Sequence, residues 1–306
     1  MGRFKQEDLD VHLPRELGIV CGSRRASECM TFERIAIIGV GLIGGSLGLA
    51  FKRGVPTPHI LGIGRNPQSL DLAQRMGAID ASALSPSGVL EDRDLVILAS
   101  PVEHILKTLD TLGSELRTGT LVSDVGSTKR LICQHAWRSL PPGIEFIGGH
   151  PVAGREVAGI ANILPGLFKG APYVLCPRPG ASPEMLSRLT RLVELVEARP
   201  IIMDAERHDQ AIAWVSHLPQ LLSTALAGQS LGKDTQISGS GFRDMIRLAA
   251  SPLSVWQGIV DSNLDNIDWA LRSYINGLEE MRVRLMEGKL SEDFRRAEAF
   301  CRATRQ

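Results

Sequence analysis

The 306-residue sequence has no excess of charge of either sign, because its 34 lysines and arginines equal its 34 aspartates and glutamates. Overall neutrality offers no broad basic surface for nucleic acid and no acidic tail for a basic partner, although a local positive pocket is still compatible with it. No apolar run approaches the roughly 20 residues that cross a bilayer, and residues 1–30 lack the apolar stretch of a signal peptide. We therefore predict a cytoplasmic protein that binds neither nucleic acid nor a membrane.

Cysteine is also scarce, and its spacing does not indicate a metal site. The five cysteines form no CxxC pair and no other metal-ligand spacing: Cys21, Cys29, Cys133, Cys176 and Cys301. We interpret them as reduced thiols of a cytoplasmic protein and predict no metal.

Short aliphatic runs alternate with helical patterns from residue 34 onward, and such runs are typical of strands covered on both faces. They occupy residues 34–39, 59–64, 94–100, 120–125, 145–149, 171–177 and 199–205. This alternation predicts an α/β fold with a doubly wound, mostly parallel sheet of the Rossmann type. After Ala205 every pattern is helical. We therefore predict a loosely ordered extension over residues 1–32, a dinucleotide-binding domain over 33–205 and an all-helical domain over 206–306.

The stretch IAIIGVGLIGGSLG places Gly39, Gly41 and Gly44 in the spacing GxGxxG between a predicted strand and a predicted helix. In this setting the first glycine permits a tight turn, the second lets the backbone approach a pyrophosphate, and the third lets the helix pack against the strand. Leu42 and Ile43 begin the helix, whose amino terminus offers unpaired N–H groups to phosphates. The motif predicts a dinucleotide cofactor; the alternative is a glycine-rich turn without a ligand.

The second predicted strand ends in Gly64-Arg65-Asn66, where an acidic residue ordinarily binds the adenine ribose. Without that carboxylate nothing repels a 2′-phosphate, and Arg65 can bind one through charge-assisted hydrogen bonds. We therefore predict NADP as the cofactor, with NAD as the alternative if Arg65 is only a solvated side chain. Ser100 and Pro101 follow another predicted strand, and we expect them to line the nicotinamide side of the site.

Several polar residues then appear in apolar or small-residue surroundings. Ser127 lies in SDVGSTK, between a predicted strand and a predicted helix, where a hydroxyl is either an N-cap or a ligand contact. The stretch GGHPVAGREVAG surrounds His150 with small residues and adds Glu156.

Two more candidates lie on the predicted helices. His217 stands two residues before Pro219, whose ring crowds the carbonyl of Val215 and is expected to bend the helix there. Arg243 and Arg247 are one helical turn apart, so we expect them on one face as a local positive pocket.

Four of these stretches, DVGSTK, GGHPVAGRE, HDQAIAWVSHLPQ and GFRDMIRLAASP, together with the glycine motif, resemble the prephenate/arogenate dehydrogenase family in their order and approximate spacing. The resemblance extends from residue 34 to about 285. It implies a homodimer formed through the helical domain, an active site between the two domains, and prephenate or arogenate as the small-molecule substrate. The implied reaction transfers a hydride from ring C4 to NAD(P)⁺, removes the 4-hydroxyl proton and releases carbon dioxide.

By the same resemblance, His150 is the catalytic base that takes the proton of the 4-hydroxyl, a role that suits an imidazole titrating near neutrality. Ser127 is expected to hydrogen-bond that hydroxyl and the histidine. Arg247 matches an arginine that binds a substrate carboxylate, and Arg243 supports it, although some relatives have lysine there. The small residues around His150 would let cofactor and substrate approach closely.

His217 matches a substrate-site histidine, and Glu156 is expected to gate the entrance or to pair with an arginine. His208 and Asp209 also match the family, but we interpret Asp209 as the cap of its own helix, because aspartate is favoured at helix amino termini.

Each assignment has a purely structural alternative. His150 could be a loop histidine, and His217 a satisfied histidine of the core. Ser127 could serve only as an N-cap, while Arg243 and Arg247 could form surface ion pairs.

Two other function classes stay open, and so does the choice between prephenate and arogenate. An NADP-dependent β-hydroxyacid-type dehydrogenase would use a lysine on the first long helix after the sheet, but none occurs between Gln210 and Gln229. A non-catalytic NADP-sensing module would not need His150, Ser127 and Arg247 together. We further expect a monofunctional enzyme without the regulatory domain or the chorismate mutase segment of some relatives.

Overall fold

The computed structural model describes residues 32–54, 56–154, 157 and 159–304, which belong to one compact unit. Two predictions fall outside these residues: Glu156, and the amino-terminal extension apart from Phe32. Phe32 is 3% exposed, and the guanidinium of Arg188 lies 4.3 Å from the centre of its ring. The folded core therefore includes this residue.

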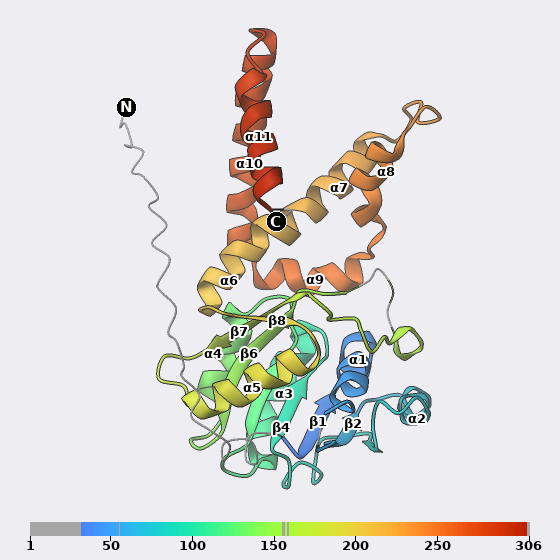
Figure 1. The fold of residues 1–306 in the computed structure, drawn as a ribbon, viewed down its shortest axis with the longest axis vertical. Coiled ribbons are helices and arrows are strands. Elements are labelled where there is room, and N and C mark those ends of the chain that lie inside the picture. Colours follow the sequence, from blue (N-terminus) through green and yellow to red (C-terminus); the bar gives the residue numbers. More distant parts are fainter. Residues whose placement is uncertain (1–31, 55, 155–156, 158, 305–306) are drawn as a thin grey trace. The chain divides into compact units, whose positions relative to one another are not determined.

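Eight strands of the described chain form one sheet in the order β3-β2-β1-β4-β5-β6-β7-β8 (Figure 1). They are β1 (Arg34–Ile38), β2 (His59–Ile63), β3 (Ala81–Ala83), β4 (Leu95–Leu98), β5 (Leu121–Asp124), β6 (Glu145–Pro151), β7 (Pro172–Pro177) and β8 (Arg199–Ile202). Neighbouring strands are parallel except for the antiparallel pair β6 and β7. This confirms the predicted doubly wound, mostly parallel Rossmann-type sheet. Edge strand β3 escapes prediction because its three residues, ASA, form no aliphatic run.

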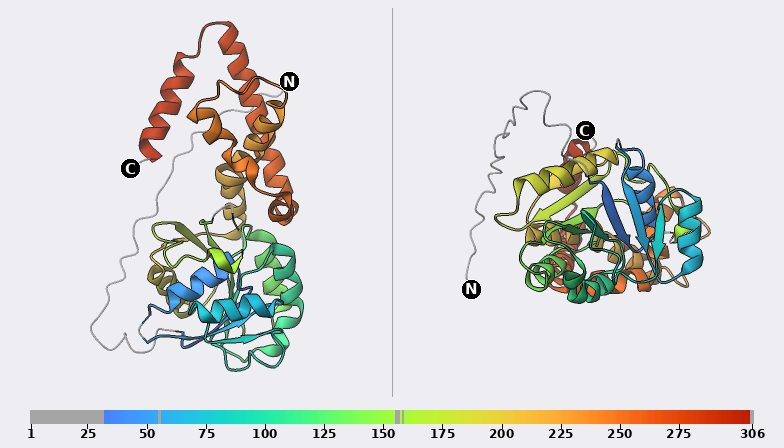
Figure 2. Two further views of the ribbon diagram at one scale, coloured as in Figure 1. Left: turned by 90° about the vertical axis from the view of Figure 1, so that its right-hand side faces the viewer. Right: turned by 90° about the horizontal axis from the view of Figure 1, so that it is seen from below.

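Alternate side chains of each strand enter two apolar layers, one on each face of the sheet. In β1, Ile35 and Ile37 pack with helices α1 (Leu42–Phe51), α2 (Pro67–Arg75) and α5 (Pro183–Leu195). Ala36 joins the other layer, which contains α3 (Val102–Leu112) and α4 (Arg130–Ser139). The views of Figure 2 show helices on both faces. This double cover explains why the strands are almost continuously aliphatic.

Beyond β8 the described chain is helical, as predicted. The helices are α6 (Ala205–Ile212), α7 (Leu218–Gln229), α8 (Ser240–Ile246), α9 (Leu253–Ser262), α10 (Leu264–Met286) and α11 (Ser291–Thr304). A π-helical turn, Ala213–His217, joins α6 to α7 directly before Pro219. The wider turn accommodates the proline ring and its missing N–H, so the predicted distortion is present. A domain division at residue 205 stays a prediction.

The segment between β5 and α4 connects the sheet to these helices. The hydroxyl oxygens of Thr128 and Ser262 lie 2.8 Å apart. The Arg130 guanidinium donates to Asp265 at 2.7 Å and to Glu206 at 3.2 Å. Thr128 and Arg130 thus contact α6, α9 and α10, and these contacts hold the start of α4 against the helical region. Within the described residues, no helix has the length and apolar character needed to cross a membrane.

Candidate active site

The glycine motif adopts the geometry that its spacing predicts. Gly39 has φ +104°, and a Cβ there would overlap the carbonyl oxygen of Ala99. A Cβ on Gly44 would overlap the carbonyl oxygen of Gly39, so this glycine is required by helix–strand packing. Gly41 differs, because a Cβ built there meets no atom within 4 Å among the described residues beyond its immediate neighbours in the chain. Gly41 is also the N-cap of α1 and provides no side-chain cap, so the helix terminus faces open space with its N–H groups available.

Arg65 and Ser100 lie beyond the carboxyl ends of β2 and β4, where ligands bind in such sheets. Arg65 is exposed, and no hydrogen bond or ion pair joins its side chain to another described residue. The neighbouring Asn66 caps α2 by accepting from the N–H groups of Gln68 and Ser69. The Ser100 hydroxyl is buried without a hydrogen-bond partner among the described residues, and Pro101 is the N-cap of α3. These positions fit a nucleotide that spans the two strands.

His150, near the carboxyl end of β6, begins a chain of three buried polar side chains. Its Nδ1 lies 2.8 Å from Nε2 of His208, and Nδ1 of His208 lies 2.7 Å from Oδ1 of Asp209. The two rings meet edge to face with their centres 5.0 Å apart. His150 is 7% exposed, His208 2% and Asp209 0%. The last two come from α6, so strand and helical region meet at this histidine.

The order of these bonds assigns the protons when both imidazoles are neutral. A carboxylate only accepts, so His208 donates from Nδ1 to Asp209 and its Nε2 becomes an acceptor. His150 then donates from Nδ1 to His208, which leaves Nε2 of His150 unprotonated. Burial is the main cause that holds the pKa of His150 well below its usual value, and electrostatic coupling to His208, Lys129 and His217 lowers it further. His150 is therefore a neutral base near pH 7.

Asp209 does not cap its own helix, so that interpretation is wrong. The cap of α6 is Asp204, which accepts from the N–H of Arg207 at 2.8 Å. Asp209 instead accepts from the N–H groups of Lys129 and Arg130, at 2.7 and 2.9 Å. These are the N-cap and first residue of α4, so a carboxylate from one helix caps another. Local sequence cannot reveal a cap that comes from a residue 79 or 80 positions away.

The small residues of the GGHP stretch have a packing explanation. A Cβ on Gly148 would lie 2.6 Å from Sγ of Cys133, and one on Gly149 would overlap the carbonyl oxygen of Asp124. Packing against α4 and β5 therefore explains why both positions are glycine. The expectation that cofactor and substrate approach closely at this stretch stays a prediction. Gly154 is different, since a Cβ there meets no atom within 4 Å in the part of the chain that the structure describes, its immediate neighbours aside.

Lys129 is a fully buried residue that sequence analysis overlooks. Its ammonium group pairs with the equally buried Asp124 and donates to the carbonyl oxygen of Gly149 at 2.7 Å. A β-hydroxyacid-type dehydrogenase would need a lysine free to exchange protons, whereas this one is held by two acceptors. Removing one partner of such a buried pair typically costs about 3–5 kcal/mol.

His217, at the end of the π-helical turn, is 1% exposed. Its Nδ1 lies 3.3 Å from Nδ2 of Asn263, which also donates to the carbonyl oxygen of Asp209 at 2.8 Å. Because the Asn263 amide nitrogen only donates, Nδ1 of His217 accepts and Nε2 carries the proton. Burial lowers the pKa of His217 to about 4, so the ring is neutral. Its Nε2 has no hydrogen-bond partner among the described residues and is an available donor.

Ser127, Arg243 and Arg247 occupy different surroundings. Ser127 is half-buried between β5 and α4, and it is not the N-cap of α4, since Lys129 takes that position. Both arginines are exposed, and α8 ends at Ile246, so they do not share one continuous α-helix. Arg247 instead begins the 3₁₀ turn Arg247–Ala250.

That 3₁₀ turn is anchored to α7 close to His217. Gln220 donates to the carbonyl oxygen of Leu248 at 2.9 Å, and the Ser223 hydroxyl accepts from the N–H of Ala249 at 3.0 Å. Gln220 lies about one helical turn after His217. Because Gln220 binds Leu248, the residue after Arg247, the 3₁₀ turn that begins at Arg247 is attached to α7 close to His217. The structure thus connects His150 to His208 by a direct hydrogen bond, and through His208 to Asp209 and the backbone of Lys129. It links His217 to Asp209 through Asn263.

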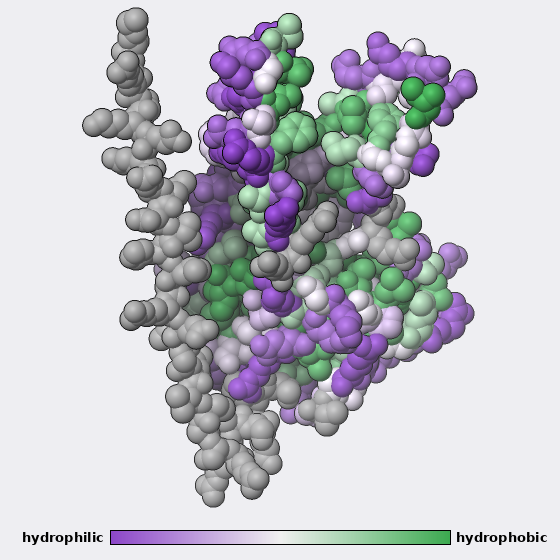
Figure 3. Space-filling view, turned by 45° about the horizontal axis from the view of Figure 1, so that its top comes forward, coloured by the Kyte–Doolittle hydropathy of each residue, from purple (hydrophilic) through white to green (hydrophobic). Residues whose placement is uncertain are grey.

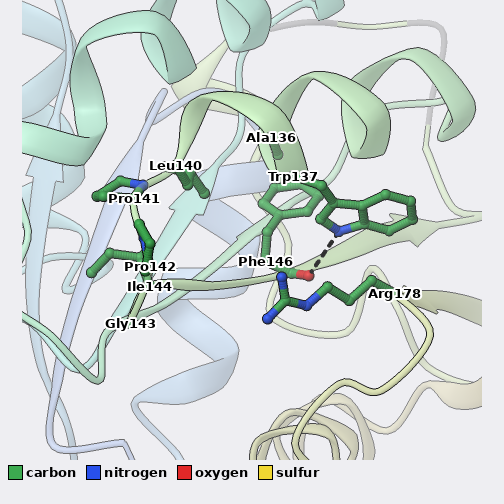
Figure 4. A pocket seen from close by; sticks show the side chains of 9 residues that line it. All are labelled: Ala136, Trp137, Leu140, Pro141, Pro142, Gly143, Ile144, Phe146 and Arg178. Atoms are coloured by element: carbon green, nitrogen blue, oxygen red, sulfur yellow. Dashed lines mark hydrogen bonds between the residues drawn. The ribbon is translucent and has the colours of Figure 1, made fainter.

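A separate pocket of about 270 Å³ lies between the end of α4 and the start of β6. Figure 4 shows Trp137 donating to the carbonyl oxygen of Phe146 at 3.3 Å, with Arg178 on the same side. The pocket contains none of the predicted site residues, and it lies at the opposite end of β6 from His150. We therefore assign no catalytic role to it.

Comparison with known proteins identifies related chains over most of this sequence. Residues 47–202 match the family model for the nucleotide-binding domain of prephenate dehydrogenase, and residues 204–297 match the model for its dimerization domain. The prephenate dehydrogenase of Bacillus subtilis is 31% identical over 86% of this chain and 73% of its own length.

Two solved structures are also similar. Prephenate dehydrogenase from A. aeolicus, in complex with hydroxyphenyl propionate and NAD⁺, superposes with a TM-score of 0.82 at 28% identity, covering 91% of this chain and 100% of that one. Arogenate dehydrogenase from Synechocystis gives 0.76 at 29% identity, covering 89% and 98%.

Proposed function

This chain belongs to the prephenate dehydrogenase family, and from that membership and the geometry around His150 we propose that it oxidatively decarboxylates prephenate or arogenate. The reaction converts the substrate and NAD(P)⁺ into carbon dioxide, NAD(P)H and 4-hydroxyphenylpyruvate or tyrosine. Both substrates share a cyclohexadiene ring with a 4-hydroxyl and a ring carboxylate, so one site can serve either.

The observation that carries this proposal is the bonded chain from His150 through His208 to Asp209. This chain engages Nδ1 of His150 and leaves Nε2 unprotonated, so Nε2 can accept the proton of the 4-hydroxyl. His208 and the buried Asp209 carboxylate then stabilise the resulting imidazolium, as an aspartate does for a histidine in other proton-transfer sites. A base placed in this way contributes about 10²- to 10⁴-fold in rate.

Three further residues bind the substrate in this proposal. The Nε2–H of His217 donates a hydrogen bond to the substrate. The ring of Trp256 packs edge to face against the His217 ring, with the ring centres 5.9 Å apart. Arg247, supported by Arg243, binds a carboxylate through its planar guanidinium. Ser127 hydrogen-bonds the hydroxyl that His150 deprotonates. Glu156 would gate the entrance.

The nucleotide is held by the turn at Gly39, Gly41 and Gly44 and by the start of α1, with Ser100 and Pro101 beside the nicotinamide. Its fit to these residues rests on the open space at Gly41 and the uncapped helix terminus. When bound, the nicotinamide accepts the hydride from ring C4. We propose NADP as the preferred form, because Arg65 is exposed at the place where a 2′-phosphate would lie.

We also propose that two copies assemble through the helical region. Its buried apolar cluster is small, comprising Ala213, Leu218, Ile267 and Ala270. Large apolar side chains on α10 and α11 are exposed, among them Ile275 at 54% and Phe294 at 71%. Figure 3 shows hydrophobic residues at the surface of the two upper projections, which Figure 1 identifies as α10 with α11 and α7 with α8. Apolar exposure on this scale is typical of an interface, and sedimentation velocity should therefore find a dimer.

The direct test is reduced-cofactor formation, followed by absorbance at 340 nm, with prephenate and arogenate each offered NADP and NAD. Turnover in any combination supports the reaction, and the preferred pair identifies substrate and cofactor. If all four combinations are silent while the nucleotide still binds, the proposal is wrong.

A further inference from the structure

Lys129 is the largest of the fully buried side chains in the described residues, and it has no role in the reaction proposed above. Its ammonium group lies against Asp124 at the end of β5 and against the carbonyl oxygen of Gly149 in β6. Burying a lysine ammonium has a large desolvation cost, which only well-placed hydrogen-bond acceptors and an opposite charge can offset. A lysine at such a position therefore points to a specific structural role.

The ion pair completes the sheet at the residue before His150. Hydrogen-bonded register between β5 and β6 ends at Ser123 and Ile147, so the β5 side of Gly149 has no strand partner. Asp124 accepts from the N–H of Gly149 at 3.0 Å, and Lys129 donates to its carbonyl oxygen at 2.7 Å. Two side chains therefore replace the missing strand and bind both backbone polar groups of Gly149, the residue before His150.

The main chain of Lys129 reaches the same histidine by a second route. Its N–H donates to Oδ1 of Asp209 at 2.7 Å, and this oxygen also accepts from Nδ1 of His208. His208 in turn accepts from Nδ1 of His150. The side chain of Lys129 thus restrains the backbone of Gly149, directly before His150. The backbone N–H of Lys129 restrains the His150 imidazole through Asp209 and His208.

We propose that Lys129 is a positioning residue that holds His150 in its place and orientation as the base. The inference rests on the proposed function, since it concerns the same proton transfer. Because Asp124 and Gly149 enclose the ammonium of Lys129, we place it out of contact with the reacting atoms and the nucleotide.

The charge of Lys129 has a second, measurable consequence. Burial is the largest cause of the low pKa of His150, and electrostatic coupling to His208, to the Lys129 ammonium and to His217 lowers it further. Asp209 on α6 and Asp124 on β5 complete the charged groups that the described elements place around it. Loss of the Lys129 charge therefore raises the pKa of His150. Because only neutral His150 is a base, the acid limb of the rate profile moves to higher pH.

The test compares Lys129→Gln, which retains a donor but loses the charge, with wild type. We expect kcat to fall about 10- to 100-fold, since a displacement near 1 Å at a reacting group costs on the order of 10². The KM for the nucleotide should not change. In ¹⁵N-histidine NMR spectra, the His150 signal, assigned with His150→Asn, should titrate at higher pH than in wild type.

A matched control is Lys52→Gln. Lys52 also pairs with a carboxylate, Asp80, and donates to a backbone carbonyl oxygen, that of Pro58 at 2.9 Å, but it lies at the far end of the sheet from His150. Its replacement should leave kcat and the His150 titration unchanged. If Lys129→Gln fails to fold, the double variant Asp124→Asn/Lys129→Gln removes the uncompensated charge and should show the same two effects.

A folded Lys129 variant with unchanged kcat and unchanged His150 titration overturns the inference. An equal loss of kcat in Lys52→Gln also overturns it, because the effect would then be general destabilisation. The NMR titration does not depend on turnover. If wild type converts neither substrate, the proposed function fails, while the titration still decides whether Lys129 controls His150.

Discussion

Replacing Asp209 with asparagine tests the chain that orients His150. The carboxylate is 0% exposed and accepts from His208 and from the N–H groups of Lys129 and Arg130. An asparagine of the same size has one acceptor oxygen and turns an NH₂ group toward at least one of these donors. The variant therefore loses a charge-assisted hydrogen bond and the favourable placement of a negative charge at the start of α4.

The magnitudes follow from these losses. A hydrogen bond to a charged group contributes about 1.5–3 kcal/mol, and a buried anion at a helix amino terminus adds up to about 2 kcal/mol. We expect Asp209→Asn to lower the free energy of unfolding by about 2–4 kcal/mol, allowing for non-additivity. Turnover should fall about 10²- to 10³-fold. This is less than the roughly 10⁴-fold loss when an aspartate that contacts the catalytic histidine directly is replaced, because His208 intervenes here.

Urea unfolding followed by circular dichroism measures the first quantity, and absorbance at 340 nm the second. Asp204→Asn is the control, since Asp204 caps α6 and asparagine caps about as well as aspartate. His208→Asn combined with Asp209→Asn should cost no more turnover than either change alone if the two residues act as a unit. A variant that loses stability but turns over at the wild-type rate would refute the relay.

Three further predictions follow from other parts of the structure. The pKa of His217 is lowered to about 4, so this buried neutral ring must gain a proton when the protein unfolds in acid. The effect of this ring on the free energy of unfolding is constant above pH ~6.5. Between pH ~6.5 and pH ~4 the free energy of unfolding falls by about 3 kcal/mol because of it. His217→Asn should flatten urea-derived stability against pH over that window, and an unchanged slope would contradict the assigned neutral state. Arg65→Ala should raise the KM for NADP about 10- to 100-fold and leave the KM for NAD unchanged. The control Arg75→Ala should alter neither value. Equal effects of Arg65→Ala on both cofactors would exclude a 2′-phosphate contact. Gly41→Ala should bind NAD(P) weakly at an unchanged Tm, while Gly44→Ala should lower Tm; a stability loss at Gly41 would mean that this glycine serves packing alone.

Continuous aliphatic runs and GxGxxG spacing depend on local burial and local turn geometry, and the sequence reveals such features directly. The aliphatic runs of β1 and β4 predict strands covered on both faces, and the open space at Gly41 agrees with the motif. The distortion at Pro219 also follows from one residue, because proline removes a specific donor.

The contacts around His150 depend on residues far apart in the chain, and local patterns do not encode them. His208 reaches His150 across 58 positions, and Asp209 reaches the start of α4 across 80. Aspartate is favoured at helix amino termini, which suggested Asp209 as the cap of its own helix, yet Asp204 is the cap. The glycines before His150 were equally ambiguous, since small residues suit close packing and ligand approach alike. Lysine is seldom fully buried, so the sequence gives no reason to place Lys129 in the core. Only the tertiary structure shows that Asp124 and the carbonyl oxygen of Gly149 are its partners.

The central claim is that Nε2 of His150 accepts the substrate proton. The most direct test is the turnover of His150→Asn, measured at saturating prephenate or arogenate alongside the dissociation constant of the nucleotide. We expect turnover to fall by about 10²- to 10⁴-fold with the nucleotide affinity unchanged, because no nucleotide-binding residue is altered. Turnover at the wild-type rate would contradict the assignment of His150 as the base.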